Sequence, residues 1–162
     1  MPDYELTPSE IISLQAQMRR DMTELAALTE AQMIAEAKAA VLDSESYLTA
    51  AEIEAITGIS QSGHDPQLYL WERDKKVFSF NHCGIDYFPA YALNPQGGWK
   101  PYIEIAKIIQ IFDGTKSGWG CAFWFEAVNG YLGGAAPKNI LAVDPTRVIK
   151  AALLEIEPIA HS

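Results

Sequence analysis

From residue 9 to residue 42 the chain contains neither glycine nor proline. This stretch is rich in Ala, Leu, Met, Glu and Gln, which are strong helix formers. At its start, Thr7, Pro8 and Glu10 have the spacing of a capping box, in which the threonine and glutamate side chains each bind a free backbone N–H. We therefore predict an N-terminal helical arm over residues 8–42, which would be about 52 Å long if continuous.

Apart from one gap of five, between Leu28 and Met33, the apolar residues of this arm are three or four positions apart, so they form one stripe along the helix. Such a helix is longer than a small domain is wide. Either a break at Thr29 divides it into two helices, or the continuous helix needs a partner. We expect a second copy of the chain, and hence a homo-oligomer through residues 8–42; the alternative is that the helix folds back onto its own domain. The stripe consists of Ile11, Leu14, Met18, Met22, Leu25, Leu28, Met33, Ala37 and Val41.

The composition is that of a folded protein. Of the 162 residues, 49% are hydrophobic and 20% charged, which supplies a core and excludes wholesale disorder. No apolar stretch approaches the ~20 residues of a membrane span, and the acidic N-terminus lacks the apolar region of a secretory signal. Two cysteines, Cys83 and Cys121, are too few for disulfide bonds to stabilise a chain of this size. We therefore expect a cytoplasmic protein with free thiols and no membrane association.

The formal net charge of −9 is unevenly distributed. Residues 1–45 carry −6, residues 46–95 carry −3, and residues 96–162 are neutral. A protein that binds nucleic acid by itself usually presents a basic face. Any DNA contact must therefore come from a small local patch. The acidic first third could instead meet a basic partner or keep the protein soluble.

The middle of the chain has the pattern of a helix-turn-helix. A second capping box, Thr49 with Glu52, opens a short helix, and Gly58 suits the left-handed residue past its end. Asp65 and Pro66 then have the residue types of an N-cap and a first helical position.

Alternating residues over 76–80 and 85–88, joined by a turn at 81–84, predict a β-hairpin after these helices. A hairpin in that place is typical of a winged helix. The last third is helical, with helices expected from residue 101, over 119–129, from 139 and over 148–156. The predicted fold is mainly α with one β-hairpin. Its parts are the arm (1–45), a winged-helix-like middle (46–95) and a C-terminal helical bundle (96–162).

These segments, in this order, resemble bacterial proteins that carry the antitoxin-type Xre/MbcA/ParS toxin-binding domain. The likeness rests on residues 49–60, 71–73, 76–80, 84–89 and the segment 124–141, which contains Asn129, the Leu-Gly-Gly sequence at 132–134, Pro137 and Leu141. It spans roughly residues 46–156 and leaves residues 1–45 outside. The resemblance implies a helix-turn-helix part, a C-terminal helical part and a toxin protein as partner.

A DNA-binding function would depend on two groups of residues. Amides and hydroxyls could reach base edges, and cations at the corner between the second helix and the hairpin could bind phosphates. The alternative is a solvated surface corner, and neutralisation by Glu72 and Asp74 would favour it. The base-reading candidates are Gln61, Ser62, His64 and Gln67; the phosphate-binding candidates are Arg73, Lys75 and Lys76.

A partner-binding surface is expected in the aromatic segment after residue 118. Aromatic residues there belong to the core by default. Five of them within 13 positions, counting Tyr131, cannot easily all face inward on one helix. Those left outside would form an apolar patch of the kind that binds proteins. The candidates are Trp119, Trp124, Phe125, Asn129, Leu132 and Leu141.

Enzymatic chemistry finds little support. His64, His82 and His161 are scattered, and the pair of His82 with Cys83 lacks the second pair of ligands that zinc needs. We expect no catalytic residue, no metal and no cofactor. The leading hypothesis is a non-enzymatic bacterial regulator that resembles an antitoxin and binds a cognate toxin through its C-terminal helices and DNA through its helix-turn-helix. The alternative is a DNA-silent interaction or scaffold protein whose helix-turn-helix is structural.

Overall fold

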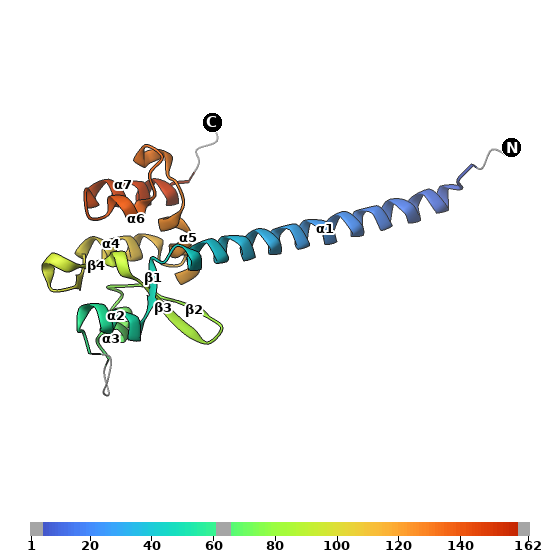
Figure 1. The fold of residues 1–162 in the computed structure, drawn as a ribbon. Coiled ribbons are helices and arrows are strands. Elements are labelled where there is room, and N and C mark those ends of the chain that lie inside the picture. Colours follow the sequence, from blue (N-terminus) through green and yellow to red (C-terminus); the bar gives the residue numbers. More distant parts are fainter. Residues whose placement is uncertain (1–4, 61–65, 159–162) are drawn as a thin grey trace. The chain divides into compact units, whose positions relative to one another are not determined.

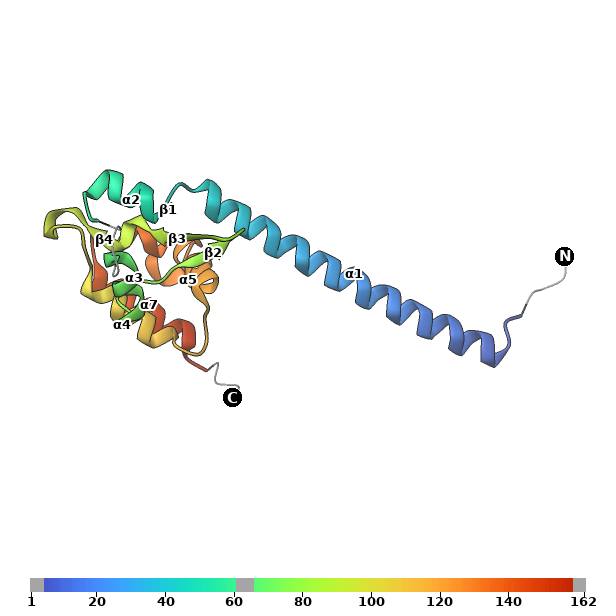
Figure 2. The same ribbon diagram turned by 90° about the horizontal axis from the view of Figure 1, so that it is seen from below.

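The computed structural model describes residues 5–60 and 66–158 and divides the chain into two compact units (Figures 1 and 2). The first comprises residues 1–39 and the second residues 40–162. Helices dominate and a small antiparallel sheet accompanies them, so the prediction of a mainly α fold with a hairpin is confirmed. In the part of the chain that the structure describes, no helix has the length and apolarity that a membrane crossing requires.

The first long helix, α1, runs without interruption over Pro8–Asp43. Its capping box is present: Thr7 N donates to Glu10 Oε2 at 2.7 Å, and Glu10 N donates to Thr7 Oγ1 at 3.2 Å. The break considered at Thr29 does not occur. The Thr29 hydroxyl donates to the carbonyl oxygen of Leu25 one turn earlier, at 2.9 Å, and the backbone stays helical because no glycine or proline interrupts it.

A three-stranded sheet and two short helices follow α1. The elements are β1 (Tyr47–Thr49), α2 (Ala50–Thr57), α3 (Gln67–Arg73), β2 (Phe80–His82) and β3 (Ile85–Pro89). The sheet order is β1-β3-β2, and both pairings are antiparallel. This succession of one strand, two helices and two strands is a winged-helix-like topology.

The hairpin is shorter than its sequence pattern predicts. Residues 76–79 lie outside the strands, and the turn is confined to Cys83 and Gly84, both with left-handed backbone (φ 52° and 82°). Two consecutive positive φ values are what a tight two-residue hairpin turn needs. Strand β1 was not foreseen. Its register pairs Leu48 with Phe88 and so adds a third strand beside β3.

The caps of α2 are those predicted. Thr49 and Glu52 form the capping box, and Gly58 follows the helix with φ 75°. Helix α3 begins at Gln67, so Pro66 is its N-cap rather than its first helical residue, and the expected cap Asp65 lies outside the described residues.

The rest of the chain is helical apart from one small hairpin. Lys100 and Pro101 form a strand, so the apolar helix starts at Ile103 instead of at the proline. The Asp144 side chain caps α7, as its pairing with Pro145 predicts. The elements are η1 (Ala90–Ala92), β4 (Leu93–Asn94), η2 (Pro95–Gly97), β5 (Lys100–Pro101), α4 (Ile103–Phe112), α5 (Gly118–Glu126), η3 (Gly130–Leu132), α6 (Pro137–Ile140) and α7 (Pro145–Ile156).

The described residues of the second unit, 40–60 and 66–158, share one hydrophobic core. Phe78, from the winged-helix-like part, stacks on Phe125 of α5 with ring centroids 5.8 Å apart, and Tyr91 packs on the same ring at 5.3 Å. Helices α4 and α7 pack against each other, and α6 contacts both α5 and α7. The boundary expected at residue 95 therefore falls inside this unit, between the paired strands β4 and β5.

Polar contacts join the start of this unit to its C-terminal helices. The hydroxyls of Tyr47 and Tyr91 are 2.6 Å apart, and burial raises the pKa of both phenols well above the ordinary value. Lys138 Nζ binds Glu126 Oε2 at 2.7 Å and Ser46 Oγ at 3.0 Å. This largely buried ion pair holds the segment before β1 to α5 and α6.

Candidate functional site

The first candidate surface is α3, the second helix of the predicted helix-turn-helix. Gln61, Ser62 and His64 lie outside the described residues. Gln67 lines a pocket together with Trp71.

The exposed side of α3 is partly covered by the hairpin. The Tyr69 hydroxyl donates to Asp86 Oδ2 at 3.2 Å, and the Tyr69 ring meets Phe88 edge-on at 5.4 Å. Desolvation first, and then the Asp86 carboxylate, raise the pKa of the Tyr69 phenol. The face of α3 that carries Tyr69 therefore packs against the hairpin through Asp86 and Phe88.

The three cations at the end of α3 do not form a basic patch. Arg73 Nε lies 3.2 Å from Asp74 Oδ1, and Lys75 Nζ lies 3.6 Å from Asp113 Oδ1. All four side chains are largely exposed, so each pair contributes little stability, but each carboxylate offsets the charge that a phosphate would meet. The third cation, Lys76, lines the same pocket as Gln67.

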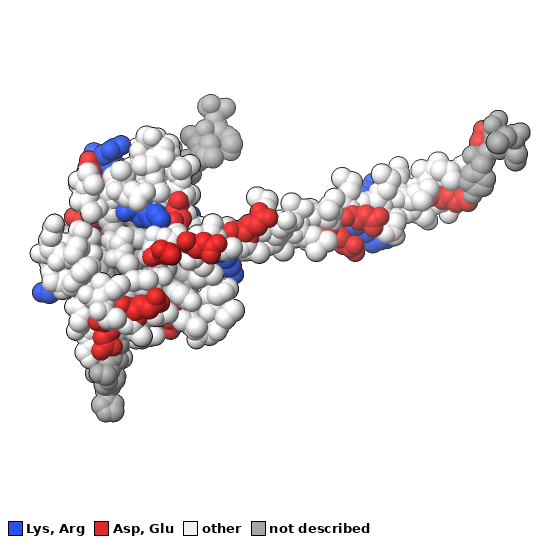
Figure 3. All heavy atoms as spheres, viewed as in Figure 1, with Lys and Arg blue, Asp and Glu red and all other residues white. Residues whose placement is uncertain are grey.

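The surface charge agrees with this local balance. On the face of the compact unit shown in Figure 3, lysine and arginine side chains lie in small separate groups between acidic ones. Arg73 and Lys75 lie beside the carboxylates of Asp74 and Asp113, respectively.

The aromatic residues of α5, the second candidate surface, are mostly built into the core. Trp119 stacks on Phe80 with centroids 3.9 Å apart, and its indole N–H donates to the Asn81 carbonyl at 3.1 Å. Trp124 is 7% exposed and packs edge-on against Phe112 and Phe125. Trp119 therefore fixes α5 to the hairpin, while Trp124 fixes it to α4.

Four of the six predicted partner-binding residues are unavailable for contact. Trp124, Phe125, Leu132 and Leu141 are all buried. The reason is that other parts of the compact unit enclose α5: Phe112 of α4 packs on Trp124, Phe78 and Tyr91 pack on Phe125, and α6 contacts α5. Their assignment is therefore corrected from surface to core.

Asn129, the fifth, closes a turn. Its side-chain oxygen accepts from Tyr131 N at 2.9 Å, and its backbone N–H donates to Ala135 O at 3.0 Å. Gly133 and Gly134 follow with φ 67° and 85°, which the tight return of the chain requires. Asn129 caps the short η3 and not α5, which ends at Glu126.

Within residues 119–141 the exposed large apolar residues lie just after α5 instead. Val128 is 79% exposed and Tyr131 is 62% exposed. Val128 and Phe123 line a pocket of about 360 Å³, beside which Lys116 Nζ pairs with Glu155 Oε1 at 3.2 Å. We call Phe123, Val128 and Tyr131 the α5 exit surface. Val128 escaped the sequence analysis because a lone valine at a helix end carries no periodic signal.

The two cysteine thiols differ in their surroundings. Burial raises the pKa of the Cys121 thiol to about 11, so it stays protonated, and Cys83 is a free thiol in the hairpin turn. Within residues 5–60 and 66–158, no three His, Cys, Asp or Glu side chains gather in an arrangement that could hold a metal ion.

Comparison with known proteins adds no identification: no protein-family model, no curated protein and no solved structure matches this chain.

Proposed function

We propose that this chain is a non-enzymatic regulatory protein that binds a protein partner through the α5 exit surface. The observation that carries the proposal is the exposure of Val128, which lines a pocket, and of Tyr131 three positions later, in the chain segment of neutral net charge. Exposed apolar residues that rim a concavity are typical of protein-binding sites, because their desolvation on binding is favourable.

The resemblance to toxin-binding antitoxins supports a toxin as that partner. The segment that carries the likeness contains Asn129, the Gly133–Gly134 turn and Leu141, which fold into the turn and core behind the exit surface. In this proposal the motif residues shape the surface, and the exposed residues make the contact.

The test uses the protein encoded by the neighbouring gene, co-expressed with the full chain. We expect the two proteins to co-purify, and Val128→Glu to abolish co-purification without lowering the melting temperature. Ile56→Glu, which places the same charge at an exposed apolar position on α2, is the matched control and should leave the complex intact. Failure of the neighbouring protein to bind, or equal binding by both variants, would overturn the proposal.

A specific observation favours the DNA-silent form of this function. The carboxylates beside Arg73 and Lys75 reduce the positive potential at the corner where a winged helix would meet phosphates. We therefore expect the chain to bind a duplex of its own promoter region weakly or not at all. Binding that weakens steeply with salt and is further weakened by Lys75→Ala with Lys76→Ala would instead support the DNA-binding form.

A further inference from the structure

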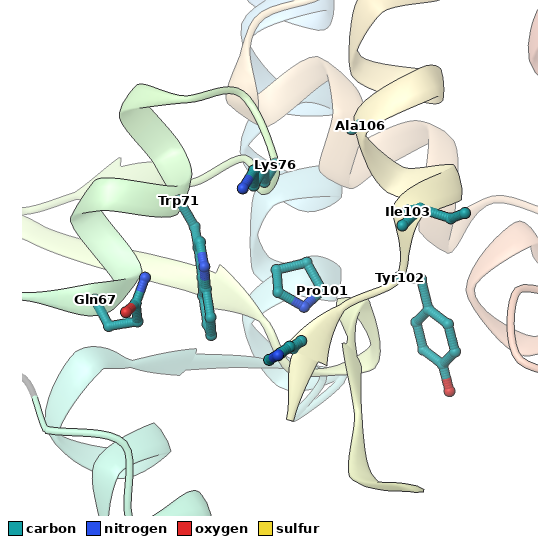
Figure 4. A pocket seen from close by; sticks show the side chains of 8 residues that line it. Gln67, Trp71, Lys76, Pro101, Tyr102, Ile103 and Ala106 are labelled. Carbon is teal, nitrogen blue, oxygen red and sulfur yellow. The ribbon is translucent and has the colours of Figure 1, made fainter. Parts of the chain in front are cut away.

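A second pocket, unrelated to the α5 exit surface, lies between α3, β5 and the start of α4 (Figure 4). Its volume is about 420 Å³, within the range of small-molecule sites. Apolar side chains and a few polar ones line it together, which is the usual make-up of such sites. The residues that matter here are Gln67, Trp71, Lys76, Lys100, Pro101 and Ile103.

The apolar part of the pocket suits a flat ring. Trp71 packs against the core and also lines the pocket, so its position is fixed by the fold. In Figure 4 the Pro101 ring lies beside the Trp71 indole, with its plane turned relative to that of the indole, and Ile103 lies beyond the proline. An indole held in this way stacks on aromatic ligands, and base–aromatic stacking is among the stronger sequence-independent contacts that proteins use.

Two lysines give the pocket its charge. Lys76 follows the end of α3 and Lys100 lies in β5, 24 positions later, yet both line the pocket. Within the described residues neither makes an ion pair, whereas Lys75, Lys116 and Lys138 each have a carboxylate partner. In a chain of net charge −9, two such cations at one apolar pocket indicate a site for an anion.

Backbone pairing fixes the main-chain positions of both lysines. Lys76 N donates to the Trp71 carbonyl at 2.8 Å and so closes the end of α3. Lys100 pairs with Asn94 in the β4–β5 hairpin. Figure 4 shows the Lys76 amine turned toward Trp71, and the Gln67 amide beside the same indole. A ring stacked on Trp71 would thus have a cation and an amide close to it.

From this arrangement we propose that the pocket binds a small molecule in which a planar heteroaromatic ring is joined to a phosphate, that is, a free mononucleotide. Trp71 and Pro101 hold the ring, Lys76 and Lys100 bind the phosphate, and the Gln67 amide can pair with a ring edge because it both donates and accepts. The site is independent of the partner-binding function proposed above.

The experiment titrates the full chain with adenosine, guanosine, cytidine and uridine 5′-monophosphates, followed by calorimetry and by backbone amide chemical shifts. We expect saturable binding of at least one of them, with shifts around Trp71 and Lys100. Lys76→Gln with Lys100→Gln should weaken that binding about tenfold or more, as expected for the loss of charged hydrogen-bond donors. Lys107→Gln with Lys150→Gln, which removes two exposed lysines that do not line the pocket, should leave it unchanged.

Three further probes separate the sources of this chemistry. The nucleoside lacks the phosphate and ribose 5-phosphate lacks the ring, so both should bind more weakly than the nucleotide. A short duplex should not compete. The proposal is overturned if no mononucleotide binds, if the pocket and control variants bind equally, if nucleoside or sugar phosphate binds as well as the nucleotide, or if the duplex displaces it. Melting temperatures of both double variants verify that they are folded.

Discussion

At the scale of single residues, Gly118 is the glycine with the least space for a side chain. It begins α5, and a Cβ atom on it would fall on the carbonyl oxygen of Ser79 in the segment before β2. Because that neighbour is backbone, it cannot rotate away. We expect Gly118→Ala to lower the free energy of unfolding by about 3 kcal/mol, as overpacking against a rigid neighbour does. The melting temperature should fall by about 10 °C.

Gly130→Ala is the matched control for that substitution. Gly130 has no atom within 4 Å of its would-be Cβ and no positive φ. Its melting temperature should stay within about 2 °C of the parent in the same thermal scan. Equal destabilisation of the two variants would show that α5 does not approach Ser79 as described.

The two cysteines should differ sharply in reactivity. Cys83 is exposed in the hairpin turn, while Cys121 is buried in α5 and its pKa is raised to about 11 by burial. The thiolate is the reactive form, so at pH 8 only about one Cys121 in a thousand would be reactive even if reagent could enter. We expect an alkylating reagent to modify Cys83 in the native protein and Cys121 only in denaturant, as read by mass spectrometry. Rapid native modification of both thiols would contradict the burial of α5.

At the scale of elements, the two capping boxes allow a comparison of like with like. Thr49 caps α2 inside the compact unit, and Thr7 caps α1 in the other unit. Loss of a threonine cap costs about 1 kcal/mol. We expect Thr49→Ala to lower the melting temperature of the compact unit by about 4 °C.

Thr7→Ala should leave that transition unchanged and reduce only the helical circular dichroism signal, since it frays the first turn of α1. A shift of the compact unit's melting temperature by Thr7→Ala as large as that by Thr49→Ala would contradict the division into two units.

The elements that sequence could predict are those whose signals are local. A cap or a glycine at a helix end depends on residues within four positions of one another, so Thr49 with Glu52 and Gly58 were placed correctly. Strand β1 was missed because three residues carry no usable alternation, and its pairing partner Phe88 lies 40 positions away.

The candidate sites were harder to predict for a related reason. Trp124 and Leu141 have the same sequence pattern whether or not another element covers them, and only the packing of distant elements, such as Phe112 of α4 on Trp124, decides that they are buried. From the sequence, Lys75 was a candidate for binding phosphate. In the fold, Asp113, 38 positions later, lies beside it and offsets its charge. The pocket of Trp71 and Lys100 escaped the sequence analysis altogether, because no motif links the end of α3 to β5.

At the scale of the whole molecule, the first unit lacks the buried hydrophobic core that stabilises the second. Among the described residues 5–39 none is buried, whereas residues 40–158 share an aromatic and aliphatic core. Isolated helices in water are marginal even with good helix formers, and most helical stability comes from packing an apolar face. The apolar residues of α1, such as Met22 at 68% exposure, therefore form an exposed apolar surface whose burial would stabilise the helix.

We expect a second copy of the chain to cover that surface. The apolar positions Ile11, Leu14, Met18, Met22 and Leu25 follow one another at intervals of three and four residues, which keeps them on one side of a continuous helix. Two identical stripes of this kind can pack along each other and exclude water from both. By light scattering, the full chain should then have at least twice the mass of 17.9 kDa that one copy has.

The substitutions that test this interface keep the helix and change only its apolar side. Leu14→Gln with Leu25→Gln should reduce the measured mass to that of a monomer, because glutamine retains helix propensity but removes apolar area. Ser13→Gln with Ala27→Gln places the same side chain at exposed positions on the opposite side of α1, and these positions should tolerate it with the oligomer intact. A parent chain that is already monomeric, or an oligomer that survives Leu14→Gln with Leu25→Gln, would show that α1 does not pair with itself. In either case its apolar stripe must be covered by something other than a second copy.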